Sequence, residues 1–533
     1  MTLPTSARHL PPRSGLLLVL AAGALHAGAL AWPWAVAGLQ GQALWWLQLP
    51  ALGLLCATLL RAPHWRSGAW LGLAFATSWL AGTFWWLFIS MHTYGGLAAP
   101  LAAGAVLVLA LFLALYYAAA GACFVLLRPS HPALTALLFA SLWLAAELAR
   151  GQWWTGFPWG AGGYAHIDGP LAPLARWVGV YGISACAAAL AMALALLQQQ
   201  PAWLRRPGTW ALAAGVAAVL AGAQWQRSQA WAQDNTLPPL SVALLQGNIP
   251  QDEKFQPGSG LPLALQWYAS QLLSADAQLV VAPETAIPVL PQQLPHTYLA
   301  ELRARFTQPG AQQAALIGIP LGNRVQGYTN SALGWSPEHA GQPYRYDKQH
   351  LVPFGEFIPP LFKWFTRLLE IPLSDFSRGD AHQPPLHWAG QRLAPNICYE
   401  DLFGEELAQR FRDPAQAPTI FVNLSNIAWF GDSVAIDQHL NISRMRALEL
   451  ERPMVRATNT GATAIIDHRG QVLERLPSAQ RSVLLGQVQG RTQITPYTHW
   501  VAHCGLWPLW AVALLPAGVL LWRRRRRAAS ALS

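Results

Sequence analysis

The feature that most constrains this chain is a series of long apolar runs that contain almost no charged residues. Of its 533 residues, 53% are hydrophobic and only 11% are charged, whereas an ordinary soluble protein carries about 25% charged residues. A helix that crosses a bilayer needs roughly 20 apolar residues. We therefore expect about eight transmembrane helices, although the stretch 14–60 could be divided differently. They are placed at 14–31, 43–60, 68–90, 101–127, 133–150, 170–197, 208–224 and 503–522.

The arginines between these segments predict the orientation of the chain. With eight spans, nearly all of them fall on one side of the membrane: Arg8, Arg13, Arg61, Arg66, Arg128, Arg205, Arg206 and Arg523–Arg527. Only Arg150 and Arg176 lie near the other side. Because positive residues favour the cytoplasmic side, both termini are expected in the cytoplasm. A signal peptide at 8–32 is an alternative, but six further spans before the soluble part favour a retained helix.

The net charge is divided unevenly along the chain. Residues 225–500 carry 21 Lys and Arg against 23 Asp and Glu, a net charge of −2, so the basic excess belongs to the membrane part. Nucleic-acid binding would need a basic face on the soluble part, and we set it aside. Three regions are predicted: a transmembrane domain at 1–224, an extracytoplasmic domain at 225–502, and a last helix with a basic cytoplasmic tail at 503–533.

The soluble part is predicted to be a layered α/β domain, because apolar β-type runs alternate with helical patterns. The expected strands are Ser241–Gln246, Leu279–Ala282, Ala315–Ile319, Leu393–Cys398, Thr419–Asn423, Val455–Thr458 and Ala462–Ile466. The expected helices are 261–275, 296–307, 400–412 and 436–451. Residues 225–239 are expected to be the linker that leaves the membrane, and residues 488–502 are expected to connect the soluble part back to the membrane.

Among five cysteines, Cys398 is the only one in the soluble part. A lone thiol that faces an oxidising compartment has no partner there for a disulfide, so it is a candidate reactive group. Two further segments carry chemistry. Glu284 follows the buried run that begins at Leu279, and Lys348 precedes the sequence His350-Leu-Val-Pro-Phe-Gly-Glu-Phe-Ile358. Active-site groups of α/β domains gather at the carboxyl ends of strands, so these segments could meet in one cleft.

Each residue type suits acyl chemistry. A thiol with a pKa of about 8.5 needs activation at neutral pH, and Glu284 could take its proton as a general base. Lys348 could stabilise the oxyanion that forms when the thiol attacks a carbonyl. Lysine is scarce, with 3 lysines in the chain against 32 arginines, so each one stands out. Taken singly, these residues could be a buried small side chain, a helix cap and a surface charge; the interpretation depends on the combination.

The order Glu284, Lys348, Cys398 resembles the Glu–Lys–Cys triad of the nitrilase superfamily. With apolar spans on both sides, nearly the whole chain is similar to the membrane-embedded branch of that superfamily, the apolipoprotein N-acyltransferases. The matching motifs are Thr155-Gly-Phe-Pro-Trp159, Gln246-Gly-Asn-Ile-Pro-Gln251, Pro283-Glu-Thr-Ala-Ile-Pro288, Lys348-Gln-His-Leu-Val-Pro-Phe-Gly-Glu-Phe-Ile-Pro359, Ile397-Cys-Tyr-Glu400 and Ala428-Trp-Phe-Gly431. One departure is Lys254-Phe255, where the family often has Lys-Trp.

The resemblance implies an αββα sandwich and a phospholipid-dependent N-acylation of the S-diacylglyceryl cysteine of apolipoproteins, through a thioester on Cys398. Phosphatidylethanolamine is the expected acyl donor, and no metal or organic cofactor is implied. Glu356, Glu400 and Tyr399 would support the triad, and Phe255, Phe354, Phe357, Trp429 and Phe430 would contact lipid, with Phe362, Trp364 and Phe365 as further walls. The implied location is the bacterial inner membrane, with the catalytic domain in the periplasm.

Two other functions remain open at this point. The chain could be a membrane-tethered amidase that acts on a small soluble amide, in which case residues 225–500 alone would retain turnover. It could also be a transporter with a non-catalytic nitrilase-like domain, in which case Cys398→Ser would leave function intact. The scarcity of ionisable residues within the spans argues against a transporter, because such residues mark ion and substrate pathways.

Overall fold

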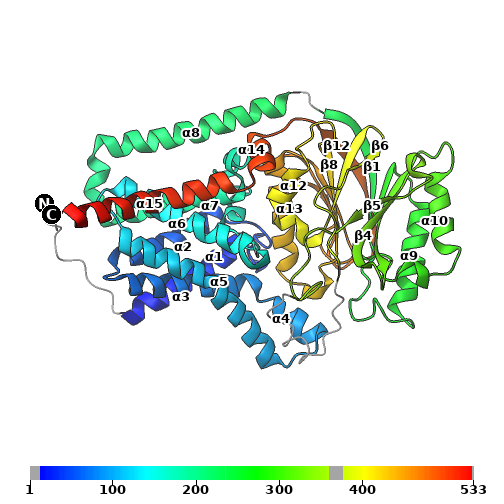
Figure 1. The fold of residues 1–533 in the computed structure, drawn as a ribbon, viewed down its shortest axis with the longest axis horizontal. Coiled ribbons are helices and arrows are strands. Elements are labelled where there is room, and N and C mark those ends of the chain that lie inside the picture. Colours follow the sequence, from blue (N-terminus) through cyan, green and yellow to red (C-terminus); the bar gives the residue numbers. More distant parts are fainter. Residues whose placement is uncertain (1–11, 234–235, 359–375, 531–533) are drawn as a thin grey trace. The chain divides into compact units, whose positions relative to one another are not determined.

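A computed structural model describes residues 12–233, 236–358 and 376–530, and the chain forms two compact units (Figure 1). The first unit consists of the chain up to Trp85, Pro100–Ala232 and the residues from Leu506 onward. The second unit contains Gln233–Gly505 together with a short segment from much earlier in the chain, Trp86–Ala99. The second unit therefore includes a segment that the predicted domain boundaries left in the transmembrane part.

The first unit is helical. Its long helices are α1 (Pro12–Leu30), α2 (Trp45–Arg61), α3 (Trp65–Phe84), α5 (Ala99–Leu127), α6 (Pro132–Gln152), α7 (Ala175–Gln199), α8 (Pro207–Ala232) and α15 (Trp507–Ser530). Each of the eight predicted apolar segments overlaps one of them. Small residues let the helices approach closely. A Cβ on Gly68 of α3 would lie 2.4 Å from the carbonyl oxygen of Gly121 in α5, so glycine is required at this crossing.

Within the described residues, three helices are long and apolar enough to cross a membrane: Ala99–Leu127, Pro132–Thr155 and Ala172–Gln199. The number rises to five if each of two interrupted helix pairs forms one span. By this criterion α1 is too short, since its described apolar stretch covers only Ser14–Leu30. The positions of the helices agree with the sequence, whereas the expected number of eight spans stays a prediction.

The second unit contains two six-stranded sheets. The first has the order β12-β1-β2-β3-β4-β5 and the second β11-β10-β9-β8-β7-β6. The strands of the first are β1 (Thr236–Gln246), β2 (Leu279–Ala282), β3 (Ala314–Asn323), β4 (Gly327–Trp335), β5 (Tyr344–Asp347) and β12 (Ser482–Arg491). Those of the second are β6 (Leu386–Trp388), β7 (Gln391–Ile397), β8 (Ile420–Ser425), β9 (Met454–Thr458), β10 (Ala464–Ile466) and β11 (Val472–Arg475).

Parallel strands occupy the centre of both sheets. In the first sheet β1, β2 and β3 are parallel, and in the second β7, β8 and β9 are parallel. Parallel neighbours end on the same edge of a sheet, which is where α/β domains carry their sites. Glu284 follows β2, Cys398 follows β7, and Asn426 follows β8.

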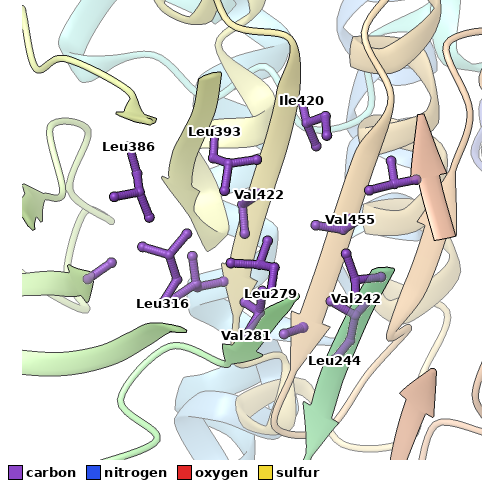
Figure 2. Packing of buried hydrophobic residues seen from close by; sticks show 14 of the residues in the cluster. Val242, Leu244, Leu279, Val281, Leu316, Leu386, Leu393, Ile420, Val422 and Val455 are labelled. Carbon is purple, nitrogen blue, oxygen red and sulfur yellow. The ribbon is translucent and has the colours of Figure 1, made fainter. Parts of the chain in front are cut away.

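The two sheets pack face to face around an apolar core (Figure 2). The core takes Val242, Leu244, Leu279, Val281 and Leu316 from the first sheet, and Leu386, Leu393, Ile420, Val422 and Val455 from the second. Helices α9 (Gly260–Ser274) and α10 (Tyr298–Thr307) cover the outer face of the first sheet. Helices α12 (Gly404–Gln409) and α13 (Ala435–Leu450) lie beside the second sheet (Figure 1). The layer order is that of the expected αββα sandwich.

The structure corrects several local predictions. The expected linker 225–239 contains the end of α8 and the start of β1. The expected connection back to the membrane, 488–502, contains the end of β12 and most of α14 (Pro496–Cys504). The helix predicted at 400–412 is two short pieces, a 3-10 helix at Cys398–Leu402 and α12. Strands β4, β5, β6, β11 and β12 were not predicted.

The short segment Trp86–Ala99 packs inside the second unit. It contains α4 (Leu87–Ile89) and a π-helical turn at Ser90–Tyr94. The indole N–H of Trp86 donates to Oε1 of Gln438 at 3.0 Å, and Trp86 is 1% exposed. Its ring lies 4.3 Å from that of Phe430, and the Tyr94 ring lies 5.9 Å from that of Trp429. The segment therefore supports the loop that follows β8.

Candidate active site

Glu284 lies in the turn that follows β2. The next residue, Thr285, has a φ of +48°, in the left-handed region. This turn comes very close to β3, because a Cβ on Gly318 would lie 2.2 Å from the carbonyl oxygen of Pro283. The backbone N–H of Ile287 donates to the carbonyl of Gly318 at 3.1 Å. Glycine at 318 thus allows the turn that presents the Glu284 carboxylate.

Lys348 follows β5 and lies between two carboxylates. Its Nζ is 3.2 Å from Oε1 of Glu284 and 2.9 Å from Oε1 of Glu356, and Lys348 is 1% exposed. Burial alone would lower the pKa of Lys348, but the two carboxylates outweigh burial and hold this pKa well above its ordinary value. Lys348 is therefore a permanent cation at physiological pH.

Asn330 joins the same two carboxylates from β4. Its Nδ2 donates to Oε1 of Glu284 and to Oε1 of Glu356, both at 2.7 Å. The other oxygen of Glu356 accepts from the backbone N–H of Val352 at 2.8 Å. Asn330 was not predicted as a site residue. No local signal marks it, because one buried asparagine in a strand has no recognisable pattern.

Cys398 stands between the end of β7 and the 3-10 helix, with a φ of +51°. Such backbone conformations cost about 1–3 kcal/mol and gather at functional sites. Glu284 and Lys348 act electrostatically on the thiol, and the Ser425 side chain and the Asn426 backbone lower its pKa slightly. Burial, reinforced by Glu284 and opposed by Lys348, raises the pKa of Cys398 to about 12. The thiol is therefore protonated at neutral pH and needs a base.

Glu400 connects the lysine segment to the cysteine segment. Its Oε1 accepts from the backbone N–H of Gln349 at 2.6 Å, and its Oε2 accepts from that of Ile397 at 2.6 Å. The Tyr346 hydroxyl donates to both oxygens, at 2.9 and 2.8 Å. Glu400 thus holds Lys348 and Cys398 in register through their neighbours. Tyr399, predicted with it, is buried and its ring lies 5.3 Å from that of Phe403.

A second buried lysine lies on the other side of Glu284. Lys254 Nζ donates to Oγ1 of Thr285 at 2.7 Å and to the carbonyl oxygen of Glu284 at 3.3 Å. Burial lowers the pKa of Lys254 to about 8, with Glu284 opposing that shift. The same loop reaches the cysteine side, because Oε1 of Gln251 accepts from Nδ2 of Asn426 at 2.8 Å. The scarcity of lysine in the sequence was a signal that pointed to Lys254.

A network of buried polar groups lies behind the cysteine. Asp401, His439, Ser443 and Arg456 are all 0% exposed. Nη1 of Arg456 is 3.2 Å from Oδ2 of Asp401, and its Nη2 is 3.1 Å from Nδ1 of His439. Ser443 hydrogen-bonds to both Asp401 and Arg456. Sequence reasoning did not identify this network, since its members are distant in sequence and none belongs to a recognised triad position.

The residues predicted to contact lipid have different degrees of exposure. Phe255 is 52% exposed, and Phe354 and Trp429 are each 40% exposed. Phe357 is partly buried, with the Arg378 guanidinium 5.3 Å from its ring centre, and Phe430 is partly buried against Trp86. Phe362, Trp364 and Phe365 lie outside the described residues. Within residues 12–233, 236–358 and 376–530, no three His, Cys, Asp or Glu side chains gather to hold a metal ion.

Two family models match the chain. The model of the apolipoprotein N-acyltransferase N-terminal domain matches residues 14–193, and that of carbon-nitrogen hydrolase matches residues 241–497. Together they match most of the helical unit and most of the sandwich.

Full-length relatives match as well. The apolipoprotein N-acyltransferase of Verminephrobacter eiseniae is 62% identical over 504 residues, which cover 91% of this chain and 92% of the relative. That of Ralstonia nicotianae is 47% identical over 491 residues and covers 91% of each chain. That of Bordetella bronchiseptica is 42% identical over 515 residues, with 90% of this chain and 92% of the relative covered. The similarity therefore extends over both units.

Proposed function

The chain belongs to the apolipoprotein N-acyltransferase family, and we propose that it acylates lipoproteins through a thioester on Cys398. The observation that carries this proposal is the convergence of three groups from three different strand ends. Glu284 and Lys348 lie 3.2 Å apart, and both act electrostatically on the Cys398 thiol. A base, a cation and a nucleophile at one site are the parts that acyl transfer needs.

The first half-reaction takes an acyl chain from a phospholipid. Glu284 accepts the thiol proton as the sulfur of Cys398 forms a bond to the ester carbonyl carbon, and the carbonyl π electrons move to oxygen. Lys348 stabilises this oxyanion, because it remains charged throughout the physiological pH range. When the carbonyl re-forms, the bond to the glycerol oxygen breaks, and Glu284 returns the proton to that oxygen. Lysophospholipid leaves and the thioester remains.

The second half-reaction transfers the acyl chain to an amine. The α-amino group of an S-diacylglyceryl cysteine attacks the thioester carbon, and Glu284 takes a proton from the nitrogen as the amide bond forms. The carbon–sulfur bond then breaks, and the proton returns to Cys398. Glu356 and Asn330 orient Lys348 and Glu284 during both steps, since they contact the same atoms. Phosphatidylethanolamine is the donor that we propose.

A two-substrate assay tests this function. Phosphatidylethanolamine with a labelled acyl chain and a diacylglyceryl-cysteine peptide should give labelled N-acyl peptide, with parallel double-reciprocal lines because the enzyme alternates between two covalent states. The membrane-tethered amidase predicts no labelled peptide and turnover of small amides instead. Converging lines would contradict the covalent route.

We also propose the topology that the arginine pattern predicts: eight spans in a bacterial inner membrane, cytoplasmic termini and a periplasmic catalytic domain. The same assay tests this in spheroplasts that express the chain. An acceptor peptide that cannot cross the membrane should be acylated from outside. Acylation only after lysis would place the catalytic domain on the cytoplasmic side.

The exposed aromatic residues around the site are proposed to bind the donor's acyl chains, and Trp429, which is 40% exposed, tests this role. Trp429→Glu is expected to raise KM for phosphatidylethanolamine about tenfold or more, since burying a large apolar side chain contributes about 1.5–3 kcal/mol. Val325→Glu is the control, because Val325 is 95% exposed in the turn between β3 and β4. Equal KM values for the two variants would contradict a lipid-contact role for Trp429.

A further inference from the structure

The carbonyl oxygen of Cys398 accepts a hydrogen bond from a buried histidine of α13. Nε2 of His439 lies 3.2 Å from this oxygen, and it also lies 3.8 Å from Oδ2 of Asp401. Neither the triad nor the lipid-contact residues account for His439. It is 0% exposed, on a helix that packs beside the second sheet.

The surroundings of His439 determine which nitrogen carries its proton. Its Nδ1 lies 3.1 Å from Nη2 of Arg456, and a guanidinium can only donate hydrogen bonds. Nδ1 therefore accepts, and the proton of a neutral imidazole must be on Nε2. Burial, together with Arg456 and Lys348, holds the pKa of His439 well below its ordinary value, so the ring is neutral. The only role left for Nε2–H is donation, and the carbonyl of Cys398 is the nearer acceptor.

This hydrogen bond orients a complete peptide group. The peptide bond between Cys398 and Tyr399 is planar and trans, since the described residues contain no cis peptide bond. In such a group the C=O and the N–H point in opposite directions. By holding the carbonyl of Cys398, His439 aims the N–H of Tyr399 away from α13. Donation to the carbonyl also polarises the amide and strengthens the N–H as a donor.

Cys398 needs such a restraint because of its backbone conformation. Its φ of +51° is unfavourable for a residue with a side chain, and a relaxed φ would rotate the carbonyl away from His439. A buried network of charged and polar groups is not needed for stability, since apolar side chains of similar volume are often as stabilising. His439 is the member of this network that contacts the Cys398 carbonyl, and this contact points to a role for the histidine in the reaction.

We propose that His439 is a positioning residue that holds the Cys398–Tyr399 peptide group so that the N–H of Tyr399 donates to the oxyanion of the acyl transition state. This inference rests on the proposed acyl chemistry at Cys398. The oxyanion would then lie between a backbone N–H and the Lys348 ammonium. Asp401 acts indirectly: it orients the Arg456 guanidinium, and this guanidinium determines the tautomer of His439.

Two reactions of the same thiol distinguish this role from a structural one. Iodoacetamide alkylates Cys398 by displacing iodide, and no oxyanion forms. p-Nitrophenyl butyrate acylates Cys398 through an oxyanion and releases p-nitrophenolate. Both rates are measured on the full-length protein in detergent, by the mass of the Cys398 peptide, and each is divided by the fraction of protein that reacts at completion. The ratio of the two rates reports on the oxyanion alone.

His439→Leu is expected to lower the ratio of acylation to alkylation about 10- to 100-fold, somewhat less than the 10²–10³-fold effect of deleting an oxyanion donor outright. His439→Gln keeps an N–H donor at a similar reach and should recover most of the ratio. If His439→Leu does not fold, His439→Asn takes its place in the test. Its side chain can still face Arg456 but is too short to reach the Cys398 carbonyl, so it should lower the ratio as the leucine variant would.

Ser443→Ala is the matched control. Ser443 belongs to the same buried network but does not contact the Cys398 carbonyl. This variant should have a lower melting temperature and an unchanged ratio. The inference is overturned if His439→Leu and His439→Asn lower both rates equally, or if wild-type Cys398 is alkylated but never acylated by the ester. If p-nitrophenyl butyrate acylates the wild type but phospholipid does not, the proposed acyl donor is contradicted. The proposed role of His439 is unaffected by that outcome.

Discussion

Cys398→Ala is expected to abolish the acyl adduct that phospholipid forms on the protein and to lower the transfer rate by at least about 10⁴-fold, as loss of a catalytic nucleophile does. The reason is that no other described group near Glu284 and Lys348 can form the thioester. Intact-mass analysis after incubation with phosphatidylethanolamine checks the adduct, and the labelled-peptide assay checks the rate. The alanine side chain removes only the thiol, so the sandwich should fold normally.

Cys504→Ala is the control for this experiment, because Cys504 is an exposed free cysteine in α14. It should keep both the acyl adduct and the activity.

The pH dependence of alkylation gives an independent check. Since the pKa of Cys398 is raised to about 12, its alkylation by iodoacetamide should keep accelerating above pH 9, where an ordinary thiol has already levelled off. An adduct that survives Cys398→Ala would place the nucleophile elsewhere.

Lys348→Met is expected to have the second large effect, and on two properties at once. It removes the cation that two buried carboxylates share, so the stability loss should be about 3–5 kcal/mol, as when one partner of a buried ion pair is deleted. It also removes the oxyanion partner, which should lower the rate by about 10²–10³-fold or more. Thermal unfolding in detergent and the labelled-peptide assay measure the two losses separately.

The pH range of this stabilising effect follows from the direction of the shift. The pKa of Lys348 is raised in the folded protein, so its contribution is fully present below the unfolded value of about 10.4 and is lost only as pH rises through the folded pKa. The difference in melting temperature between wild type and Lys348→Met should therefore stay constant between pH 6 and 9. A difference that disappears within this window would contradict the shared ion pair.

A double variant separates stability from catalysis. In Lys348→Met with Glu356→Gln, one of the two carboxylates becomes neutral, so much of the lost stability should return. The rate should stay low, because the oxyanion still has no cation. Arg345→Met is the matched single control: Arg345 pairs with Asp347 at 2.9 Å on the surface, with 48% of its side chain exposed, and should cost little. Recovery of activity in the double variant would remove Lys348 from the mechanism.

Much of the architecture could be predicted from the sequence because it depends on local pattern. A bilayer requires long apolar runs, and all eight of them became helices. Buried parallel strands are short and continuously apolar, and every strand that was predicted on this basis exists. Strand β4 was missed for a physical reason: Thr329, Asn330 and Ser331 are buried in it as polar groups. A strand that supplies hydrogen bonds to a site lacks the apolar alternation by which strands are recognised.

The sequence alone determined which residue types could carry the chemistry, because a lone thiol, a scarce lysine and a carboxylate after a buried strand are visible in the chain itself. The tertiary structure decided what surrounds them. Residues more than 60 positions apart, such as Glu284 and Lys348, meet because β2 and β5 run in the same direction and end on one edge of the first sheet. Asn330 and His439 have no local signature, since their roles come from distances and burial that exist only after the sheets pack. The same packing raises the pKa of Cys398, an effect that no local pattern encodes, and this increases the dependence of the thiol on a base.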